Sequence, residues 1–299
     1  MKILITGATG SVGLQVIKCL DALENTIEIV AGVRDIANDR QRLADYKVSF
    51  VPFDFTKCES FREALSDIDI LFLLRPPQLS NVEKYVKPLI QAAKANQTKH
   101  IVFLSVQGAE KSRLIPHYKI EKLIVESGIG FTFLRPAYFM QNFITTLKDE
   151  LVNQKRIFLP AGKAKFTLVD TSDIGKVAAR ILTHHQAHIN KAYELTNQEQ
   201  LTFEQMADKL TKGLGIKINY VSPNLLRFFI VMRKRKTPAM LILVMIMLHY
   251  FPKFQKTPAC SNWVKELTNS EPTTFDEFVQ NNRNQLIAPA VFKFLVQKK

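Results

Sequence analysis

Nearly continuous apolar runs alternate with amphipathic stretches along the part of the chain that precedes Pro136. An apolar run without a polar side is typical of a parallel strand that helices cover on both faces. The expected strands are Lys2–Thr6, Ile27–Val33, Lys47–Val51, Ile70–Leu74, His100–Ser105 and Gly130–Leu134. The expected helices between them are Val12–Leu23, Glu59–Ser66, Val82–Asn96 and Tyr118–Ser127. This alternation predicts an α/β fold built on a doubly wound parallel sheet.

The rhythm of apolar and polar positions changes after Arg135. The expected elements there are helices over Phe139–Leu151, Asp173–Leu182 and Thr202–Lys212, and strands over Phe166–Val169, Ala192–Leu195 and Lys217–Val221. The chain from Pro223 onward reads as mostly helical. Its longest apolar run, Ala239–Phe251, is shorter than the roughly 20 residues that span a bilayer. We therefore expect no membrane span, and we read this run as a buried helix in preference to a membrane-surface segment.

The turn after the first strand carries three glycines, in the run Gly7-Ala8-Thr9-Gly10-Ser11-Val12-Gly13. The first glycine permits a tight reversal, the second leaves room for a pyrophosphate, and the third lets the next helix lie close to the sheet. The free N–H groups at the start of that helix favour phosphate. We therefore predict a dinucleotide site. The expected contact residues are Gly7, Thr9, Gly10, Ser11, Val12 and Gly13.

The end of the second strand, where dinucleotide-binding proteins distinguish NAD from NADP, reads Ala31-Gly32-Val33-Arg34-Asp35. Small Gly32 would leave room for a 2′-phosphate, and Arg34 would pair with it. This arrangement favours NADP(H) over NAD(H) as the cofactor. In the alternative interpretation Arg34 is a surface arginine and Asp35 accepts hydrogen bonds from the ribose diol.

A serine, a tyrosine and a lysine follow the fifth strand in a spacing that suits proton transfer. Ser105 ends that strand, Tyr118 lies thirteen residues later, and Lys122 lies four residues beyond it. Residues four apart share one face of a helix, so Tyr118 and Lys122 can address one ligand. A positioned tyrosine can then act as general acid beside a serine that holds the substrate oxygen. In the alternative interpretation, Tyr118 is an aromatic cap and Lys122 lies on a solvated face.

The glycine spacing and the Ser105, Tyr118 and Lys122 set together resemble the atypical short-chain dehydrogenase/reductases, and the NmrA-like group in particular. This resemblance implies that Asp54 and Phe55 contact the adenine and that Lys122 holds the nicotinamide ribose beside Ser105. It also implies cofactor contacts from the ends of the fourth and sixth strands. These are Leu74, Arg75, Pro76, Pro136 and Tyr138.

Two features depart from the conventional members of that superfamily. The fourth strand ends Leu74-Arg75-Pro76-Pro77 in place of Asn-Asn-Ala-Gly, and Pro116 closely precedes Tyr118. Many NmrA-like relatives also lack a catalytic tyrosine, and some are sensors that bind the cofactor without turnover. A non-catalytic function therefore stays open.

Length and composition narrow the class further. The 299 residues allow a Rossmann domain over residues 1–155 and a smaller, mostly helical substrate-binding lobe over 156–299, with some strands returning to the Rossmann sheet. Three widely spaced cysteines argue against a disulfide framework or a zinc knuckle, and they suit the reducing cytoplasm.

The net charge is +14, but only Arg233–Lys236 forms a dense run, so we expect no nucleic-acid partner. His184, His185 and His188 have no acidic or cysteine partner nearby, so no metal is expected.

These observations predict an NADP(H)-dependent oxidoreductase that passes hydride to a small, aromatic or quinone-like acceptor. Ser105 would position the acceptor and Tyr118 would supply the proton. The first alternative is a non-catalytic redox sensor of the NmrA-like type, which would act on a protein partner. The second is a sugar-nucleotide epimerase, which Arg34 disfavours because such enzymes hold NAD. The acceptor and the oligomeric state stay open.

Overall fold

The computed structural model describes residues 1–23 and 26–288, and the end of the expected second lobe, residues 289–299, lies outside this range. The chain forms two compact units that interleave along the sequence. The first unit contains Met1–Ala137, Val169–Thr196 and Ser261–Pro272. The second contains Tyr138–Leu168, Asn197–Cys260 and the described residues from Thr273 onward. The expected boundary between residues 155 and 156 falls inside the second unit.

Seven parallel strands form the sheet of the first unit, in the order β10-β6-β5-β4-β1-β2-β3. Their bounds are β1 Lys2–Thr6, β2 Glu28–Val33, β3 Ser49–Pro52, β4 Ile70–Leu73, β5 His100–Leu104, β6 Gly130–Pro136 and β10 Lys191–Leu195. The chain runs outward from β1 through β2 and β3 and then crosses to β4 on the other side of β1. The carboxyl ends of strands at such a switch point are where doubly wound sheets bind ligands. The prediction of a doubly wound α/β Rossmann-type fold is confirmed.

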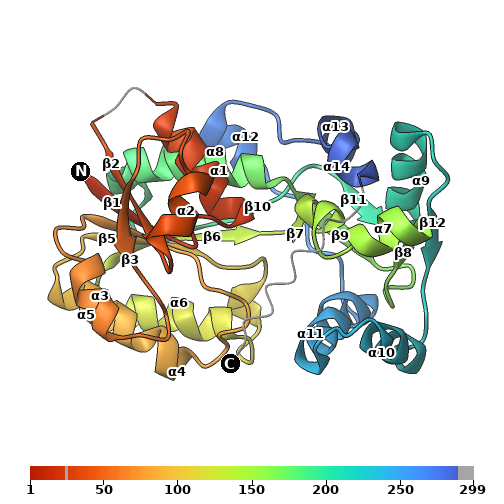
Figure 1. Cartoon of the computed structure of the whole chain (residues 1–299), viewed down its shortest axis with the longest axis horizontal. Helices are drawn as coiled ribbons and strands as arrows, with labels where there is room; N and C mark the ends of the chain where they lie inside the picture. The colour runs from red at the N-terminus through yellow and green to blue at the C-terminus, as the bar shows by residue number, and fades with distance from the viewer. Residues whose placement is uncertain (24–25, 289–299) are drawn as a thin grey trace. The chain divides into compact units, whose positions relative to one another are not determined.

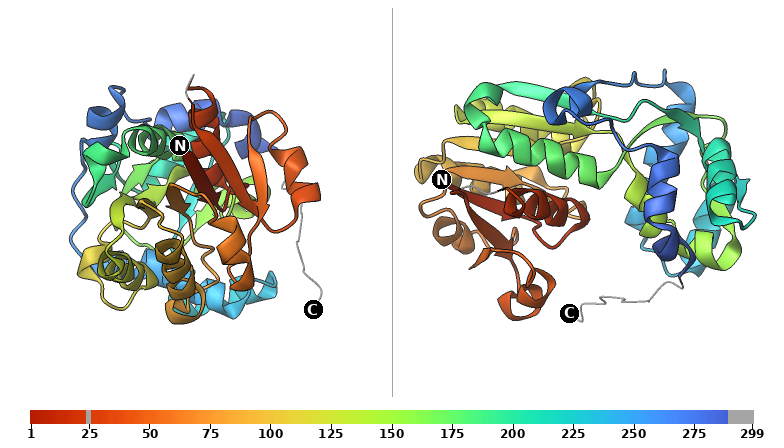
Figure 2. Two further views of the ribbon diagram at one scale, coloured as in Figure 1. Left: turned by 90° about the vertical axis from the view of Figure 1, so that its left-hand side faces the viewer. Right: turned by 90° about the horizontal axis from the view of Figure 1, so that it is seen from above.

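Helices cover both faces of this sheet (Figures 1 and 2). One face carries α1 (Ser11–Asp21), α8 (Thr171–Thr183) and α12 (Trp263–Thr268). The other carries α3 (Glu59–Ala64), α4 (Val82–Tyr85), α5 (Lys87–Ala95) and α6 (Pro116–Ser127). Helices α1 and α8 approach closely because Gly175 has no side chain, and a Cβ there would lie 2.8 Å from the Gln15 backbone. This contact holds the chain after Val169 against the first helix.

The second unit has two small sheets and is otherwise mostly helical. Strands β7 (Tyr138–Phe139), β9 (Lys165–Val169) and β11 (Gln200–Thr202) form one sheet, and β8 (Arg156–Phe158) pairs with β12 (Asn219–Val221) in the other. Its helices are α7 Lys148–Gln154, α9 Phe203–Leu214, α10 Leu225–Lys234, α11 Ala239–Tyr250, α13 Phe275–Asn281 and α14 Arg283–Ile287. Fully buried phenylalanines fill its core, namely Phe143, Phe158, Phe203, Phe228, Phe275 and Phe278.

Several elements differ from the sequence-based expectation, and two of them have a clear physical reason. The helix expected over Phe139–Leu151 is instead the strand β7, a 3-10 turn at Met140–Ile144 and then α7, because Tyr138–Phe139 join the sheet of β9. A short helix, α2 (Ile36–Arg42), follows β2 and was not predicted. None of its residues is buried, so it carries no apolar periodicity that a pattern could detect.

The apolar run at Ala239–Phe251 forms helix α11 over most of its length, but the expectation that this helix is buried is wrong. Only Ile242, Met245 and His249 of α11 are buried, and they share one face. The remaining faces are largely exposed. Among the described residues, no helix has both the length and the apolar character that crossing a membrane requires.

Candidate cofactor and active site

The glycine-rich turn is a compact loop that joins β1 to α1 and lies against Leu74, the residue after β4. Gly7 has a φ of +63°, and a Cβ there would lie 2.8 Å from Leu74 Cδ2. Its carbonyl oxygen accepts a 3.0 Å hydrogen bond from the Gly10 amide. A Cβ on Gly13 would lie only 2.3 Å from that same carbonyl oxygen. Both positions therefore require glycine, as the spacing predicted.

The N-terminus of α1 is electrostatically open to an anion. Gly10 is the N-cap, no side chain caps the helix, and no acidic residue lies in its first turn. Ser11 is exposed and Thr9 is half-buried, whereas the buried Val12 can offer a ligand only its backbone. Free N–H groups with a partial positive charge form an anion site of the kind that holds a pyrophosphate.

Arg42 adds a cation to this loop that the sequence analysis missed. It lies at the end of α2, where its Nη2 donates to the Thr9 carbonyl oxygen at 3.1 Å. Its side chain is 61% exposed and also lies near Asp39. No short motif marks this arginine, because α2 itself has no pattern. The charge of Arg42 makes the loop more attractive to phosphate.

The residues at the end of β2 bear on whether Arg34 meets a 2′-phosphate or Asp35 meets a ribose diol. Arg34 is exposed directly after the strand. Asp35 is the N-cap of α2, and its carboxylate accepts hydrogen bonds from the Asn38 amide nitrogen at 3.2 Å and from Asn38 Nδ2 at 2.5 Å. These bonds, the backbone one first, hold the pKa of Asp35 below its usual value. The carboxylate that would bind a ribose diol is therefore already used in capping a helix.

Gly32 does not leave open space for a phosphate, contrary to the sequence-based interpretation. A Cβ there would lie 3.2 Å from Phe53 Cβ and 3.3 Å from Leu4 Cδ1, so neighbouring side chains already fill the space. The glycine instead lets Phe53 pack against β2. Any contact with a third phosphate at this edge would come from Arg34.

Asp54 and Phe55 lie directly after β3, where the resemblance implied contact with adenine. Asp54 Oδ1 accepts hydrogen bonds from the Thr56 amide and hydroxyl, both at 2.8 Å. Phe55 is buried, and its ring packs edge-on against Phe53 at 4.9 Å between centroids. Both side chains thus shape the loop, and the ring of Phe55 belongs to the core.

The chain after β4 holds a buried arginine that pairs with no carboxylate of the described residues. Arg75 is 9% exposed, and its Nη1 donates to the carbonyl oxygens of Pro76 at 2.8 Å and Leu79 at 2.9 Å. Its Nε has no hydrogen-bond partner within the described part of the chain. Burial and the Arg75 charge lower the pKa of His117 to about 4. An anionic group near this guanidinium would be stabilised, which fits the expected cofactor contact.

Ser105 belongs to a charge network (Ser105, Glu121, Arg135 and Glu110) that runs from the buried Ser105 and Glu121 to the exposed Glu110. Its hydroxyl donates to Glu121 Oε1 at 2.5 Å. Arg135 from β6 donates two hydrogen bonds to the same carboxylate, from Nε at 3.0 Å and from Nη2 at 2.7 Å. A third nitrogen of Arg135 lies 2.9 Å from Glu110 Oε2. Because its proton points to Glu121, Ser105 can accept a hydrogen bond from a ligand but does not donate one in this arrangement.

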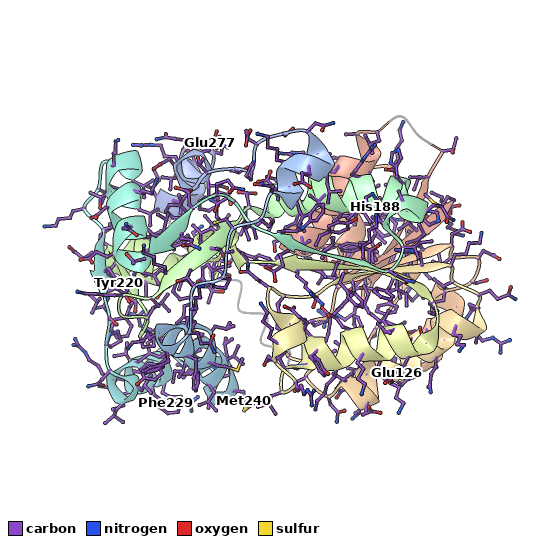
Figure 3. The ribbon with its side chains drawn as sticks, turned by 180° about the vertical axis from the view of Figure 1, so that it is seen from behind. Glu126, His188, Tyr220, Phe229, Met240 and Glu277 are labelled. Atoms are coloured by element: carbon purple, nitrogen blue, oxygen red, sulfur yellow. The ribbon has the colours of Figure 1, made fainter. Side chains whose placement is uncertain are left out.

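The structure does not join Lys122 to Ser105. Tyr118 lies, partly buried, in the first turn of α6, which begins at Pro116. Lys122 is 63% exposed, and its Nζ lies 3.7 Å from Glu126 Oε1, one turn along the same helix (Glu126 is labelled in Figure 3). Glu121, which does reach Ser105, was not predicted. The available signal was a carboxylate on the buried face of α6 beside Ile124.

The residues after β6 divide between the two units. Pro136 ends β6, and its carbonyl oxygen accepts the Gln107 amide at 3.0 Å. Tyr138 lies in the second unit, where its hydroxyl is 3.1 Å from His249 Nε2. His249 Nδ1 lies 2.6 Å from the Met245 carbonyl oxygen and must donate to it, so Nε2 accepts the Tyr138 proton. Burial raises the pKa of Tyr138 and lowers that of His249 to about 4.

Within the described residues, no group of three or more His, Cys, Asp or Glu side chains could hold a metal ion. Of the histidine cluster, His185 and His188 lie in a 3-10 turn, and His188 Nδ1 lies 2.8 Å from the Tyr193 hydroxyl.

The fold and the glycine loop define an NAD(P)-binding Rossmann protein. The chain belongs to the NmrA-like family, whose model matches residues 1–279. It is 29% identical to prestalk A differentiation protein A of Dictyostelium discoideum over 94% of this chain and 92% of that one. It is 31% identical to quinone oxidoreductase 2 of Escherichia coli over 73% of this chain and 76% of that one. The solved triphenylmethane reductase of Citrobacter sp., complexed with NADP(H), is 25% identical with a TM-score of 0.82, over 94% and 99% of the two chains.

Proposed function

We propose that this protein is an NADPH-dependent oxidoreductase that reduces a small aromatic or quinone-like acceptor. The similarity to quinone oxidoreductase 2 over 73% of the chain carries this proposal. The similarity to triphenylmethane reductase, whose structure holds NADP(H), supports the same class of cofactor and a flat aromatic acceptor. A reduced nicotinamide, when bound, supplies the hydride.

We propose that Arg34 and Arg42 select the phosphorylated cofactor. Arg34 is exposed at the end of β2, Arg42 reaches the glycine loop, and Asp35 is used as a helix cap. A hydrogen bond to a charged group contributes about 1.5–3 kcal/mol. The Arg34→Ala variant should therefore bind NADPH about 10- to 100-fold more weakly in calorimetry, with NADH binding unchanged.

The matched control for this experiment is Arg40→Ala. Arg40 lies on α2, the helix that follows Arg34, and its guanidinium carbon lies 5.6 Å from the centroid of the Phe50 ring of β3. Removing it changes the net charge equally, so it reports the general electrostatic contribution. Equal losses of NADPH affinity in the two variants would show that Arg34 does not contact the third phosphate.

Among the residues expected to act in the reaction, we propose that Tyr118 donates the proton and that Ser105 acts chiefly by orienting Glu121. Reduction of a quinone by hydride requires one proton, which Tyr118 would supply, and the exposed Lys122, which lies beside Glu126, would take no part in this step. Lys122→Ala should keep kcat within about twofold. Tyr118→Phe should lower kcat about 100-fold or more, because general acids contribute at least about that factor. A larger loss in Lys122→Ala than in Tyr118→Phe would favour the Ser105–Tyr118–Lys122 arrangement that the sequence suggested.

A redox sensor is the second candidate. The contacts of Ser105 with Glu121 and of Lys122 with Glu126 favour it over a reductase that depends on Ser105 and Lys122.

Purified protein should be tested for NADPH oxidation with benzoquinones, naphthoquinones, azo dyes and triphenylmethane dyes. Acceptor reduction matching NADPH consumption supports the reductase. Tight NADPH binding without turnover of any acceptor supports the sensor. The absence of binding heat with NADPH and NADH would contradict both.

A further inference from the structure

Helix α11 exposes an apolar surface although its other side is firmly anchored. Ile242, Met245 and His249 face inward, and the Tyr138 hydroxyl bonds to His249. The sequence of α11, AMLILVMIMLHY, is apolar on every face. A helix of this kind is ordinarily shielded from water all round, in a protein core or within a membrane.

The exposed side chains form one surface together with those of α10 and the turn after α11. We call this the α10–α11 surface, and Figure 3 labels Phe229 on α10 and Met240 at the start of α11. Its members are Leu226, Ile230, Met240, Leu241, Leu243, Val244, Met247, Leu248, Phe251 and Phe254. Met240 and Phe254 are each 72% exposed. Most of the large exposed apolar side chains of the described residues lie on these neighbouring elements, and such a concentration of exposed apolar side chains marks an interaction site.

The segment that forms the α10–α11 surface contributes basic residues and no acidic ones. The sequence from Pro223 to Cys260 contains no Asp or Glu. Its exposed cations are Arg227, Arg233, Lys234, Lys236, Lys253 and Lys256. Arg235 is set apart from them by its ion pairs with Asp149 and Glu150. Apart from Arg235 and its two carboxylate partners, the charged residues that this segment places around the apolar surface are therefore all basic.

We propose that the α10–α11 surface docks onto an anionic lipid bilayer. Interfacial helices bury apolar side chains at the boundary between lipid headgroups and acyl chains, and they place Lys and Arg at the level of the headgroups. The 12 residues of α11 extend about 18 Å, which is too short to span the hydrocarbon core but suits a helix lying in the interface. Phe251 and Phe254 extend the apolar surface past the end of the helix.

Charge decides between a bilayer and a second copy of the chain. A symmetric dimer through the α10–α11 surface would bring two sets of exposed basic residues together on chains that each carry a net charge of +14. Anionic headgroups would instead neutralise each set. The docking does not depend on the proposed reaction, and its test requires no turnover.

The test is flotation of the full chain with two kinds of vesicle, one of phosphatidylcholine alone and one with about a third phosphatidylglycerol. We expect at least tenfold stronger binding to the anionic vesicles, weakened by raising the salt, because each basic residue near such a surface gains about 1 kcal/mol that salt screens. Equal binding to the two compositions, or binding to neither, would overturn the proposal. This comparison uses only the natural chain, so it stands even where a variant fails to fold.

A pair of double variants tests which surface docks. Met240→Glu/Leu243→Glu changes two residues of the α10–α11 surface that are 72% and 51% exposed, and it should reduce vesicle binding at least tenfold. The control is Leu114→Glu/Val125→Glu, at 92% and 51% exposure on the first unit, which should leave binding within about twofold after allowing for its equal change in charge. Equal losses in both variants would refute docking through α10–α11. A concentration-dependent dimer that only the first variant abolishes, without vesicle binding, would assign the surface to a second copy.

Discussion

Replacing Gly13 by alanine tests the geometry on which the dinucleotide site depends. An alanine Cβ at this position would lie 2.3 Å from the Gly7 carbonyl oxygen and 2.9 Å from Ala8 Cα. Both are main-chain atoms of the loop, and Gly7 is itself held at a φ of +63° against Leu74. The clash cannot be relieved by turning a flexible side chain, so either the loop or α1 must move.

The expected magnitude follows from the kind of contact. Overpacking a well-packed region destabilises by about 1–3 kcal/mol, and contacts with main-chain atoms place Gly13→Ala near the upper end, at about 3 kcal/mol. Gly10→Ala is the matched comparison, because its Cβ would lie 3.2 Å from the Gly7 carbonyl oxygen at an exposed position. We expect about 1 kcal/mol or less for that change. It would nevertheless place a methyl group where a pyrophosphate is expected to approach.

Urea denaturation with and without NADPH separates the two effects. The ligand stabilises the native state by about 2.7 kcal/mol at 100 times its Kd. A 30-fold weaker Kd in Gly10→Ala would reduce that gain to about 1 kcal/mol at the same NADPH concentration, with little change in the absence of ligand. Gly13→Ala should lose stability in both conditions. Stability of Gly13→Ala within about 0.5 kcal/mol of the natural chain would refute this account of the loop.

Three further changes test other parts of the structure. Tyr138→Phe leaves His249 Nε2 without its donor and should lower the free energy of unfolding by about 1–3 kcal/mol in urea denaturation, and an unchanged midpoint would contradict the hydrogen bond. Burial holds the pKa of His249 at about 4, below the ordinary 6.5, so its neutral form contributes stability above pH 6.5 that is lost as the pH falls toward 4. The loss should approach about 1.4 kcal/mol per pH unit, and His249→Gln should flatten the pH dependence of the melting temperature, whereas parallel curves would refute the assignment. Glu121→Gln removes one of two carboxylates that face Arg135 and should destabilise by about 2–3 kcal/mol, and a melting temperature equal to that of the natural chain would show that the pair contributes little.

The elements that the sequence predicted well are those with local causes. Strands β1, β2, β4, β5 and β6 were predicted to within about two residues because buried parallel strands are continuous apolar runs. The glycine loop was predicted because its steric limits are largely local: Gly7 has a φ of +63°, and a Cβ on Gly13 would meet the Gly7 carbonyl oxygen of the same turn. Helix α2 was not predicted because none of its residues is buried, so it has no apolar face that a sequence pattern could show.

The sequence by itself determined the type of sheet, the loop at its first turn and the family of the chain. Only the tertiary structure decided that Ser105 donates to Glu121, that Arg42 reaches Thr9, and that Asp35 caps a helix. It also decided which faces of α11 are covered. The physical reason is that periodicity records how a segment satisfies its own backbone and its apolar residues. Ion pairs, hydrogen bonds between distant segments and the coverage of an all-apolar helix depend on which other segments arrive beside it, and no local pattern carries that information.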